Sequence, residues 1–232
     1  MKNIFVLEHR NPSLIDRGQT HLTNQGFNIC NVNTSLGDHI PLLDQNCAGV
    51  IIMGGPQSIM QLGSYPFLKA EINFVCEVME KHIPLLGICL GAQIIAYANG
   101  ARIFNHPEGY YAFGYYEVTP TAIGCNFIPD KFYVPAANSQ GFEVPTNAKL
   151  LAKGKLFPNQ AYCLGDRIVG LQFHPEVNYK ILQFWHEIFS TDGSNPFVQS
   201  KATQFKYLKK YDHVIDEWYS RLLDQLFVRE GH

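Results

Sequence analysis

The sequence has little net charge and few charged residues. Its 18 Lys and Arg are balanced by 20 Asp and Glu, which gives a formal net charge of −2, and charged residues make up only 16% of the 232 positions. Lys and Arg are scattered, so the chain lacks a basic stretch of the kind that binds nucleic acid or an anionic membrane. With 46% hydrophobic residues the chain is also too apolar to be disordered. We therefore expect a globular protein with neither nucleic acid nor a membrane as its partner.

The usual spacings of metal and redox sites are missing as well. The six cysteines include no C-x-x-C pair, and no H-x-x-x-H is present, so we predict no metal site, redox dithiol or other cofactor. The first ten residues contain only a four-residue apolar run, which is too short for the hydrophobic region of a signal peptide. Unpaired thiols and the missing signal favour the cytoplasm.

Short apolar runs alternate with amphipathic stretches over the first hundred residues, which is typical of the βαβ units of a mostly parallel sheet. Ser64 is the expected N-cap of the second helix, with Pro66 in its first turn, and Gly100 is the expected C-cap of the third. The predicted strands cover 4–7, 27–32, 48–53 and 83–88, and the predicted helices cover 13–25, 66–81 and 90–99.

The rest of the chain predicts an added antiparallel region and two closing helices. Segments rich in strand-forming residues, separated by Gly, Pro and Asn, are expected to add antiparallel strands at 101–104, 112–119, 148–153, 159–163 and 167–173. The closing helices are predicted at 177–189 and 197–228. The second has an apolar stripe at spacings of three and four, formed by Leu208, Tyr211, Ile215, Trp218, Leu222 and Leu226. We expect the stripe to pack on the core of one domain spanning 1–232, with a partner-docking face as the alternative.

The most informative segment is Gly87–Gln93, with the sequence GICLGAQ, at the passage from an apolar strand to a helix. It has the form of a nucleophile elbow in which Cys89 replaces serine. Gly87 and Gly91 relieve the crowding of such a turn, and the helix N-terminus favours a thiolate. Chance would produce G-x-C-x-G only about 0.04 times in a chain of this composition, so we interpret Cys89 as a nucleophile rather than a structural cysteine.

A general base is expected at His174. The sequence Phe173–Glu176, FHPE, directly follows a predicted strand, and functional groups gather at the carboxyl ends of parallel strands. His174 would exchange a proton with Cys89 and with the leaving group, and Glu176 would orient the imidazole.

A third element, MGGPQS at 53–58, follows the strand that ends at Met53. Consecutive glycines leave backbone N–H groups free to point at an anion. Gly55 and Leu90 are therefore the expected donors of an oxyanion hole, although Gly-Gly-Pro alone is an ordinary turn.

Together, GICLGAQ, MGGPQS and FHPE resemble the class I, or triad, glutamine amidotransferases, in a form similar to stand-alone proteins related to the glutaminase domain of GMP synthase. The resemblance covers essentially the whole chain. It implies a flavodoxin-like three-layer sandwich with an added antiparallel region. It further implies hydrolysis of the glutamine side-chain amide through a thioester on Cys89, with release of ammonia. The site residues that it implies are Cys89, His174 and Glu176 as triad, Gly55 and Leu90 as oxyanion hole, and Gly54, Gln93, Ser139, Gln140 and Gly141 as substrate contacts.

Two segments depart from the family's pattern. At 138–142 relatives carry a Ser-His-Gly-Asp sequence, and here the His and Asp positions are Gln140 and Phe142. At 111–115 the sequence YAFGY lacks the basic residue and the glutamate that many relatives have. Recognition of an amino-acid end needs well-placed polar groups, so these changes bear on the acyl donor rather than on the triad.

Three functions remain open from the sequence. One is a glutaminase that supplies ammonia to a separate synthetase, because the chain has neither a Walker A motif nor an S-G-G-x-D-S loop. Another is a stand-alone γ-glutamyl hydrolase or peptidase that uses the same triad. The third is a non-catalytic binding protein, which predicts a damaged triad, whereas all three residues are present.

Overall fold

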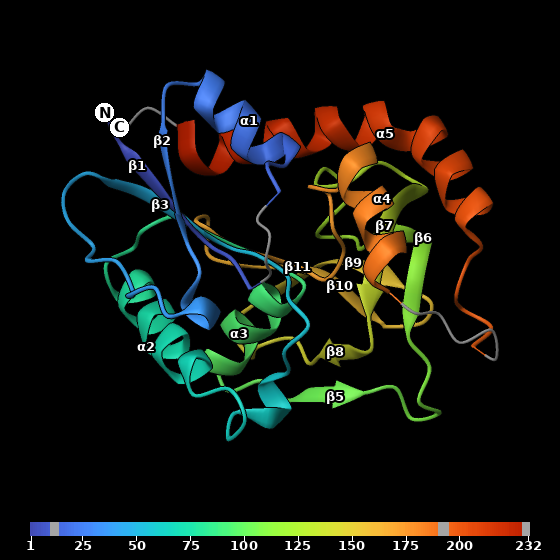
Figure 1. Ribbon diagram of the computed structural model, residues 1–232, viewed down its shortest axis with the longest axis horizontal. Helices are drawn as coiled ribbons and strands as arrows, with labels where there is room; N and C mark the ends of the chain where they lie inside the picture. Colours follow the sequence, from blue (N-terminus) through green and yellow to red (C-terminus); the bar gives the residue numbers. More distant parts are fainter. Residues whose placement is uncertain (10–13, 190–194, 229–232) are drawn as a thin grey trace.

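The computed structural model describes residues 1–9, 14–189 and 195–228, and in these residues the main sheet has nine strands (Figure 1). Their order is β2-β1-β3-β4-β11-β10-β9-β6-β7. The first five of these strands run parallel to one another, and the pairs from β11 onward are antiparallel. The sheet therefore has a parallel half and an antiparallel half, which meet at β11.

The parallel half is built from β1 (Asn3–Leu7), β2 (Asn28–Val32), β3 (Cys47–Ile52), β4 (Leu85–Ile88) and β11 (Ile168–Leu171). Its connecting helices are α1 (Arg17–Asn24), α2 (Phe67–Glu80) and α3 (Leu90–Ala98), and short 3₁₀ turns lie at Thr34–Leu36 and Ile59–Gln61. On β3, Ile51 belongs to the core shared with α1 and α5, whereas Val50 and Ile52 belong to the core shared with α2 and α3. This alternation makes the three layers visible in Figure 1, where α1 and α5 cover one face of the sheet and α2 and α3 cover the other.

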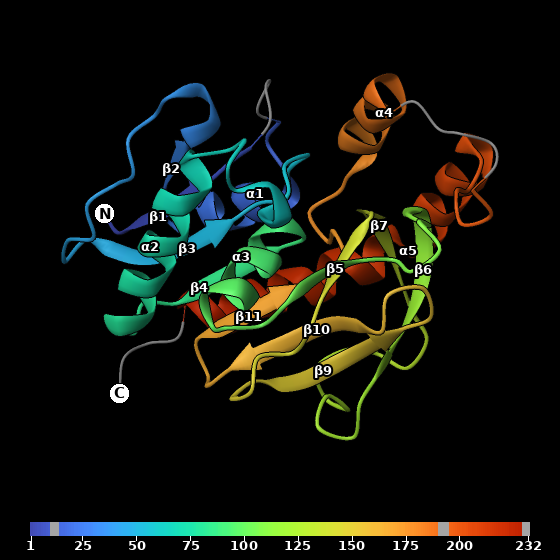
Figure 2. The same cartoon turned by 90° about the horizontal axis from the view of Figure 1, so that it is seen from below.

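The antiparallel half continues the sheet through β10 (Asn159–Leu164), β9 (Lys149–Gly154), β6 (Ala112–Pro120) and β7 (Phe132–Asn138) (Figure 2). A separate two-stranded sheet pairs β5 (Ile103–Asn105) with β8 (Gln140–Phe142). Two helices follow, α4 (Tyr179–Ile188) and α5 (Lys201–Leu223), and a π turn at Asp224–Val228 extends α5. The predicted fold class, a mostly parallel sheet with an antiparallel addition and C-terminal helices, is confirmed.

Several strand predictions in the second half were wrong. The segment predicted at 167–173 forms β11, which pairs with β4 in parallel and with β10 in antiparallel fashion, so it joins the halves. The segment at 101–104 forms β5 in the small sheet instead of extending the main one. β7 and β8 have no counterpart among the predicted strands. Pro135 lies inside β7, which is tolerated because β7 is an edge strand of the main sheet, and β8 has only three residues.

Helix ends also differ from the predictions. α1 begins at Arg17, because the Asp16 side chain accepts a hydrogen bond from the Gln19 backbone N–H; position 13 of the predicted helix lies outside the described residues. Ser64 is not the cap of α2: its N–H donates to the Gln61 carbonyl, and Pro66 takes the N-cap position without a side-chain bond.

The last two helices start later than predicted, because capping side chains set their first turns. Asn178 caps α4 and Ser200 caps α5, so the helices begin at 179 and 201 rather than at 177 and 197. Gly100 has φ +79° directly after α3, whose C-cap is Asn99, so it takes the left-handed position that ends the helix. In α5, every residue of the apolar stripe packs in or against the core that covers the sheet.

Candidate active site

Cys89 lies on a sharp turn between β4 and α3. Its backbone angles, φ 50° and ψ −104°, fall in a region that a residue with a Cβ rarely adopts. A side chain at Gly87 would come within 2.6 Å of the Gly91 backbone, and one at Gly91 would overlap the carbonyl oxygen of Ile52. Both glycines of the predicted elbow are thus required by close backbone approach.

The thiol of Cys89 is almost completely buried. Gln172 Nε2 lies 3.6 Å from the sulfur, in position to donate to it, and the carbonyl oxygen of Ala137 lies 3.9 Å from the sulfur on another side. Cys89 is also the N-cap of α3, where helix N–H groups without intrahelical partners favour a negative charge. Cys89 therefore has a hydrogen-bond donor and an acceptor beside its sulfur, at the start of a helix.

The register of β11 brings His174 to the same place. Because Ile88 pairs with Leu171, the residues after both strands emerge side by side at one edge of the sheet. The His174 N–H donates to the carbonyl of Pro135 at 2.8 Å, which ties this turn to the antiparallel half. Nδ1 of His174 lies 2.7 Å from Oε1 of Glu176, and Trp185 packs edge-on against the imidazole, with ring centroids 4.9 Å apart.

Two opposing effects set the protonation of His174. Burial disfavours the imidazolium, but the negative charges of Glu176 and of a Cys89 thiolate outweigh burial and raise the pKa of His174 to about 10. Since Glu176 Oε1 is an acceptor, Nδ1 carries a proton, and Nε2 is buried with no hydrogen-bond partner among the described residues. Nε2 is therefore free to exchange a proton with Cys89, whose negative charge is one of the causes of the raised pKa.

The Gly54–Gly55 loop closes the third side of this centre. A side chain at Gly54 would come within 2.6 Å of His174 Cε1 and 3.4 Å of Cys89 Cβ, so the loop touches both predicted catalytic residues. Leu90 is the first residue of α3, and its N–H has no partner within the helix. The structure therefore places both predicted oxyanion donors, Gly55 and Leu90, on the wall of the same cavity as Cys89.

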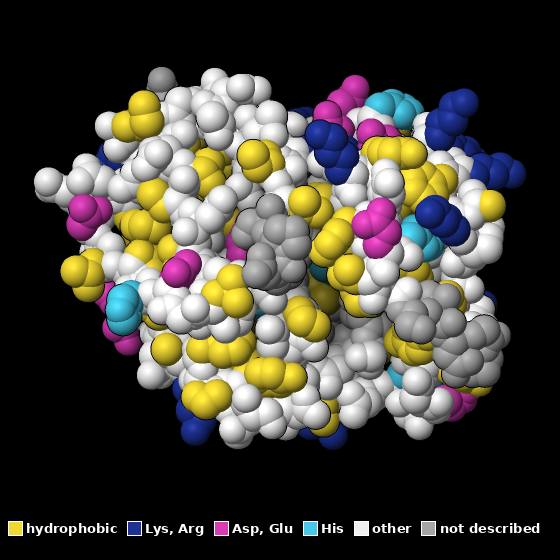
Figure 3. Space-filling model, in the orientation of Figure 1, with side chains coloured by type: hydrophobic (Ala, Val, Ile, Leu, Met, Phe, Trp, Pro, Cys, Tyr) yellow, Lys and Arg dark blue, Asp and Glu magenta, His cyan; other side chains and the backbone are white. Residues whose placement is uncertain are grey.

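That cavity has a volume of about 980 Å³, at the upper end of the roughly 300–1,000 Å³ found for small-molecule sites. Apolar side chains surround it (Figure 3), and four of them are among the most exposed large apolar residues of the chain: Leu36, Met60, Ile188 and Phe189. Nine of the ten predicted site residues line it: Gly54, Gly55, Cys89, Leu90, Gln93, Ser139, Gln140, His174 and Glu176. Gly141 does not line it: a side chain there would point toward Phe157 and Phe104.

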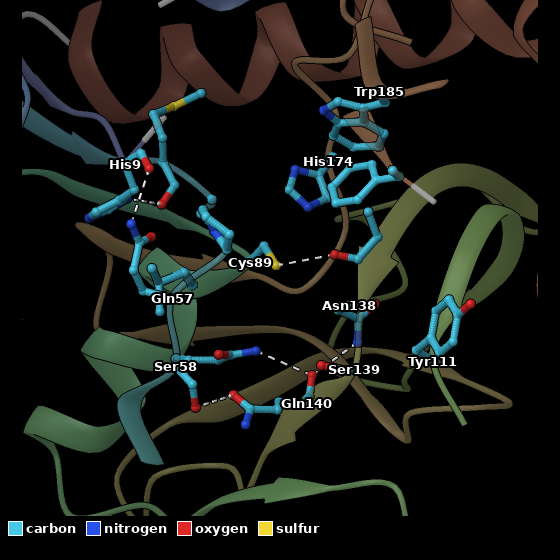
Figure 4. A pocket seen from close by; sticks show the side chains of 18 of the residues that line it. His9, Gln57, Ser58, Cys89, Tyr111, Asn138, Ser139, Gln140, His174 and Trp185 are labelled. Carbon is cyan, nitrogen blue, oxygen red and sulfur yellow. Dashed lines mark hydrogen bonds between the residues drawn. The ribbon is translucent and has the colours of Figure 1, made fainter. Parts of the chain in front are cut away.

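The two predicted glutamine contacts with long side chains are engaged with the protein itself. Gln93 Nε2 donates to the Gln140 carbonyl at 3.2 Å and to Gln172 Oε1 at 3.4 Å. The Gln140 side chain accepts from the Ser58 hydroxyl at 2.9 Å (Figure 4). It also donates to Asn105 Oδ1 at 3.0 Å. Gln140 thus connects β8 to β5 and to the loop after β3, while Ser139 lines the cavity.

The two departures from the family's sequence pattern have different structural outcomes. Phe142 is fully buried and packs edge-on against Tyr162, with ring centroids 5.1 Å apart, so this position fills the core. Tyr111 and Phe113 line the cavity, and the Phe113 ring lies 5.3 Å from that of Phe189. Tyr111 and Ala112 therefore stand where the family pattern has charged residues, whereas Phe113 takes its aromatic position.

Sequence reasoning missed one pair of residues at the cavity. His9 lines it, and its Nε2 lies 2.8 Å from Oε2 of the fully buried Glu71. The available signal was the position of His9 at the carboxyl end of the first strand, the edge where Cys89 and His174 also emerge. Its partner Glu71 is 62 residues away in the sequence, so no local motif joins the two residues.

Two further properties bear on the class of protein. Within the described ranges, no group of three or more His, Cys, Asp or Glu residues is arranged to hold a metal ion. Across the same part of the chain, no helix combines the length and the apolar character needed to cross a lipid bilayer.

Comparison with known proteins agrees with this geometry. The family model described as glutamine amidotransferase class-I matches residues 19–182. A GMP synthase (glutamine-hydrolyzing) from Aeropyrum pernix is 32% identical over 146 residues, which are 62% of this chain and 26% of that protein. The corresponding enzyme from Borrelia garinii is 29% identical over 138 residues, 59% of this chain and 25% of that one. The chain thus spans about a quarter of the length of these curated relatives.

Solved structures extend the likeness of fold over the whole chain. A glutamine amidotransferase from Thermotoga maritima superposes with a TM-score of 0.88 at 23% identity, covering 98% of this chain and 99% of that one. One from Methylobacillus flagellatus gives 0.90 at 21% identity, with 100% and 98% covered. The chain belongs to the class I glutamine amidotransferases, so the resemblance carried by the three motifs is confirmed.

Proposed function

We propose that this protein hydrolyses the side-chain amide of glutamine through a γ-glutamyl thioester on Cys89 and releases ammonia. The observation that carries the proposal is the grouping of Cys89, His174 and Glu176 beside the Gly54–Gly55 loop at one end of a cavity. Membership of the amidotransferase family supports the reaction class.

In the acylation step, the sulfur of Cys89 attacks the amide carbon of glutamine. The raised pKa of His174 favours a thiolate–imidazolium pair, so His174 holds the proton that the reaction needs before substrate is attacked. The N–H groups of Gly55 and Leu90 would stabilise the oxyanion of the tetrahedral intermediate. When the C–N bond breaks, His174 Nε2 donates its proton to the leaving nitrogen, and ammonia departs.

Deacylation uses the same groups in reverse. His174 Nε2 accepts a proton from a water molecule, whose oxygen attacks the thioester carbon, and the C–S bond then breaks to release the thiolate while His174 keeps the proton. Glutamate leaves, and the starting state is restored. Throughout, Glu176 holds Nδ1 in its protonated form and fixes the plane of the ring.

The destination of the ammonia is part of the proposal. The relatives named GMP synthase (glutamine-hydrolyzing) suggest a use for the ammonia, so we propose that a separate synthetase in the cytoplasm receives it. A stand-alone γ-glutamyl hydrolase remains the second candidate. It is favoured by one observation, the cavity volume of about 980 Å³, which leaves room for a γ-glutamyl compound larger than glutamine.

The test is ammonia release from glutamine by the purified protein, together with intact-mass analysis for an acyl adduct. We expect Cys89→Ala to abolish both turnover and the adduct, whereas Cys163→Ala, which changes a half-buried thiol in β10, leaves both unchanged. Faster Cys89-dependent cleavage of γ-glutamyl peptides than of glutamine would establish the second candidate. Failure of Cys89 to acylate with any γ-glutamyl donor would refute the acyl-enzyme mechanism.

A further inference from the structure

The chain buries an acid–base pair that the proposed reaction does not use. The side chains of His9 and Glu71 have no exposed surface, and their Nε2 and Oε2 atoms are 2.8 Å apart. The other carboxylate oxygen of Glu71 accepts a hydrogen bond from the Thr34 hydroxyl, and the imidazole stacks on Phe67. A buried ion pair contributes little net stability compared with apolar residues of the same size, so stability alone is a poor reason for placing one here.

The pair is attached to the loop that follows β3. His9 Nδ1 lies 3.1 Å from the carbonyl oxygen of Met53, and Gln57 Nε2 donates to the His9 carbonyl at 3.3 Å. Between these contacts, Gly55 packs so tightly on His9 that a Cβ at Gly55 would overlap the Cβ of His9. His9 therefore contacts this loop at its start, at the predicted oxyanion donor and at its end (Figure 4).

The protons of the pair follow from its partners. The Met53 carbonyl oxygen can only accept a hydrogen bond, so Nδ1 of His9 is the donor. Because the peptide bond is rigid, this hydrogen bond also fixes the plane of the Met53 peptide. Nε2 faces a carboxylate oxygen, so one further proton must lie between His9 and Glu71. Glu71 thus holds the His9 imidazole through a charge-assisted hydrogen bond at Nε2. On the other side of the ring, Nδ1–H points at the loop.

We propose that His9 and Glu71 are positioning residues that hold the Gly54–Gly55 loop in the geometry required by the oxyanion of acylation. Glu71 fixes the imidazole, and the imidazole fixes the Met53 peptide and the path of Gly55. This inference rests on the proposed acyl-enzyme chemistry. Neither residue touches the reacting atoms in this assignment; they act through the loop.

The experiment compares two double variants that differ at a single hydrogen bond. His9→Phe with Glu71→Met replaces the pair by apolar groups, which preserves or raises stability in comparable cases. His9→Asn with Glu71→Met removes the same charge pair but places a side-chain N–H where Nδ1 lies, so the bond to Met53 can form. A matched control, His21→Phe with Asp224→Met, removes a pair of similar length, 2.7 Å, that lies outside the cavity lining.

Two rates are measured for each protein. Acylation of Cys89 by glutamine needs the oxyanion hole, whereas alkylation of Cys89 by iodoacetamide needs only the thiolate. We expect the Phe/Met variant to acylate more slowly by about tenfold to a hundredfold, through kcat rather than KM, with alkylation unchanged. The Asn/Met variant should recover most of the acylation rate, and the control should match the wild type.

The outcomes separate this inference from the proposed function. Wild-type acylation rates in a folded Phe/Met variant, or equal losses in both double variants, would overturn the positioning role while leaving the triad intact. Absence of acylation in the wild type would instead refute the proposed function. If the Phe/Met variant does not fold, Glu71→Gln replaces it, because the amide keeps the bond to Thr34 but loses the charge. In that variant unchanged acylation overturns the inference, and slower acylation with unchanged alkylation supports it.

Discussion

The parallel and antiparallel halves of the main sheet contribute to the site in different ways. The carboxyl ends of β1, β3, β4 and β11 place His9, the Gly54–Gly55 loop, Cys89 and His174 around one point. The antiparallel half supplies the opposite wall of the cavity through Tyr111, Phe113 and the turn at 138–140. Parallel strand ends therefore hold the proposed reacting groups, and the antiparallel region shapes the space in which a donor lies.

The largest expected effects come from two glycines with the same steric problem, one in each half. A Cβ at Gly91 would overlap the Ile52 carbonyl, and a Cβ at Gly124 would overlap the Leu151 carbonyl. Because backbone must move in each case, we expect each substitution by alanine to cost at least about 3 kcal/mol of unfolding free energy. Urea denaturation measures that cost.

Activity should distinguish the two variants. Per folded molecule, Gly91→Ala should lose at least about a hundredfold in kcat, because it moves Cys89 relative to β3, whereas Gly124→Ala should keep the wild-type value. Equal kcat losses in both would mean that the two halves are not functionally distinct.

A smaller effect is expected at the contact between the halves. Gln140→Ala removes the side-chain hydrogen bonds to Ser58 and Asn105, so we expect a loss of about 1–2 kcal/mol in stability. We also expect KM for the acyl donor to rise about tenfold with kcat nearly unchanged, since the change touches binding rather than the triad. Steady-state kinetics with glutamine check this, and a fall in kcat with constant KM would assign Gln140 to the chemistry.

Through the triad, the unfolding free energy of the protein should depend on pH. The pKa of His174 is raised from 6.5 to about 10 in the folded protein, so its stabilising contribution is complete below pH 6.5 and is lost as pH rises toward 10. Glu176→Gln removes one of the charges that raise this pKa, so unfolding free energy should fall less steeply over that interval than in the wild type. Urea titrations at several pH values measure this. If the unfolding free energy of both proteins fell equally with pH, Glu176 would not be a cause of the raised pKa of His174.

The smallest effect belongs to an exposed pair that joins β5 and β8. Arg102 and Glu143 lie 2.7 Å apart, but their side chains are 75% and 49% exposed. Arg102→Ala should therefore cost less than about 1 kcal/mol, in contrast to the buried pair at His9. Thermal unfolding at low and high salt measures this, and a larger, salt-independent loss would show that β5 and β8 depend on the pair.

The same division explains how much could be predicted from the sequence. In the parallel half, β1, β3 and β4 are each followed by a helix, so local apolar patterns were enough to find β1 to β4. Strand pairing in the second half depends on distant segments: nothing near 168–171 indicates that β11 pairs with β4, and Pro135 conceals β7. The triad was predictable because its residues lie in compact motifs, whereas His9 was missed because its partner comes from another element.

The position of β11 has a consequence for protein synthesis. Leu85 pairs with Ile168, so the whole antiparallel half must be made before β11 can take its place beside β4. A nascent chain that has emerged only as far as α3 presents Cys89 without His174 and Glu176. In the proposed mechanism such a chain has no general acid, so amide cleavage begins only after the ribosome has passed Glu176 and the last parallel strand has docked.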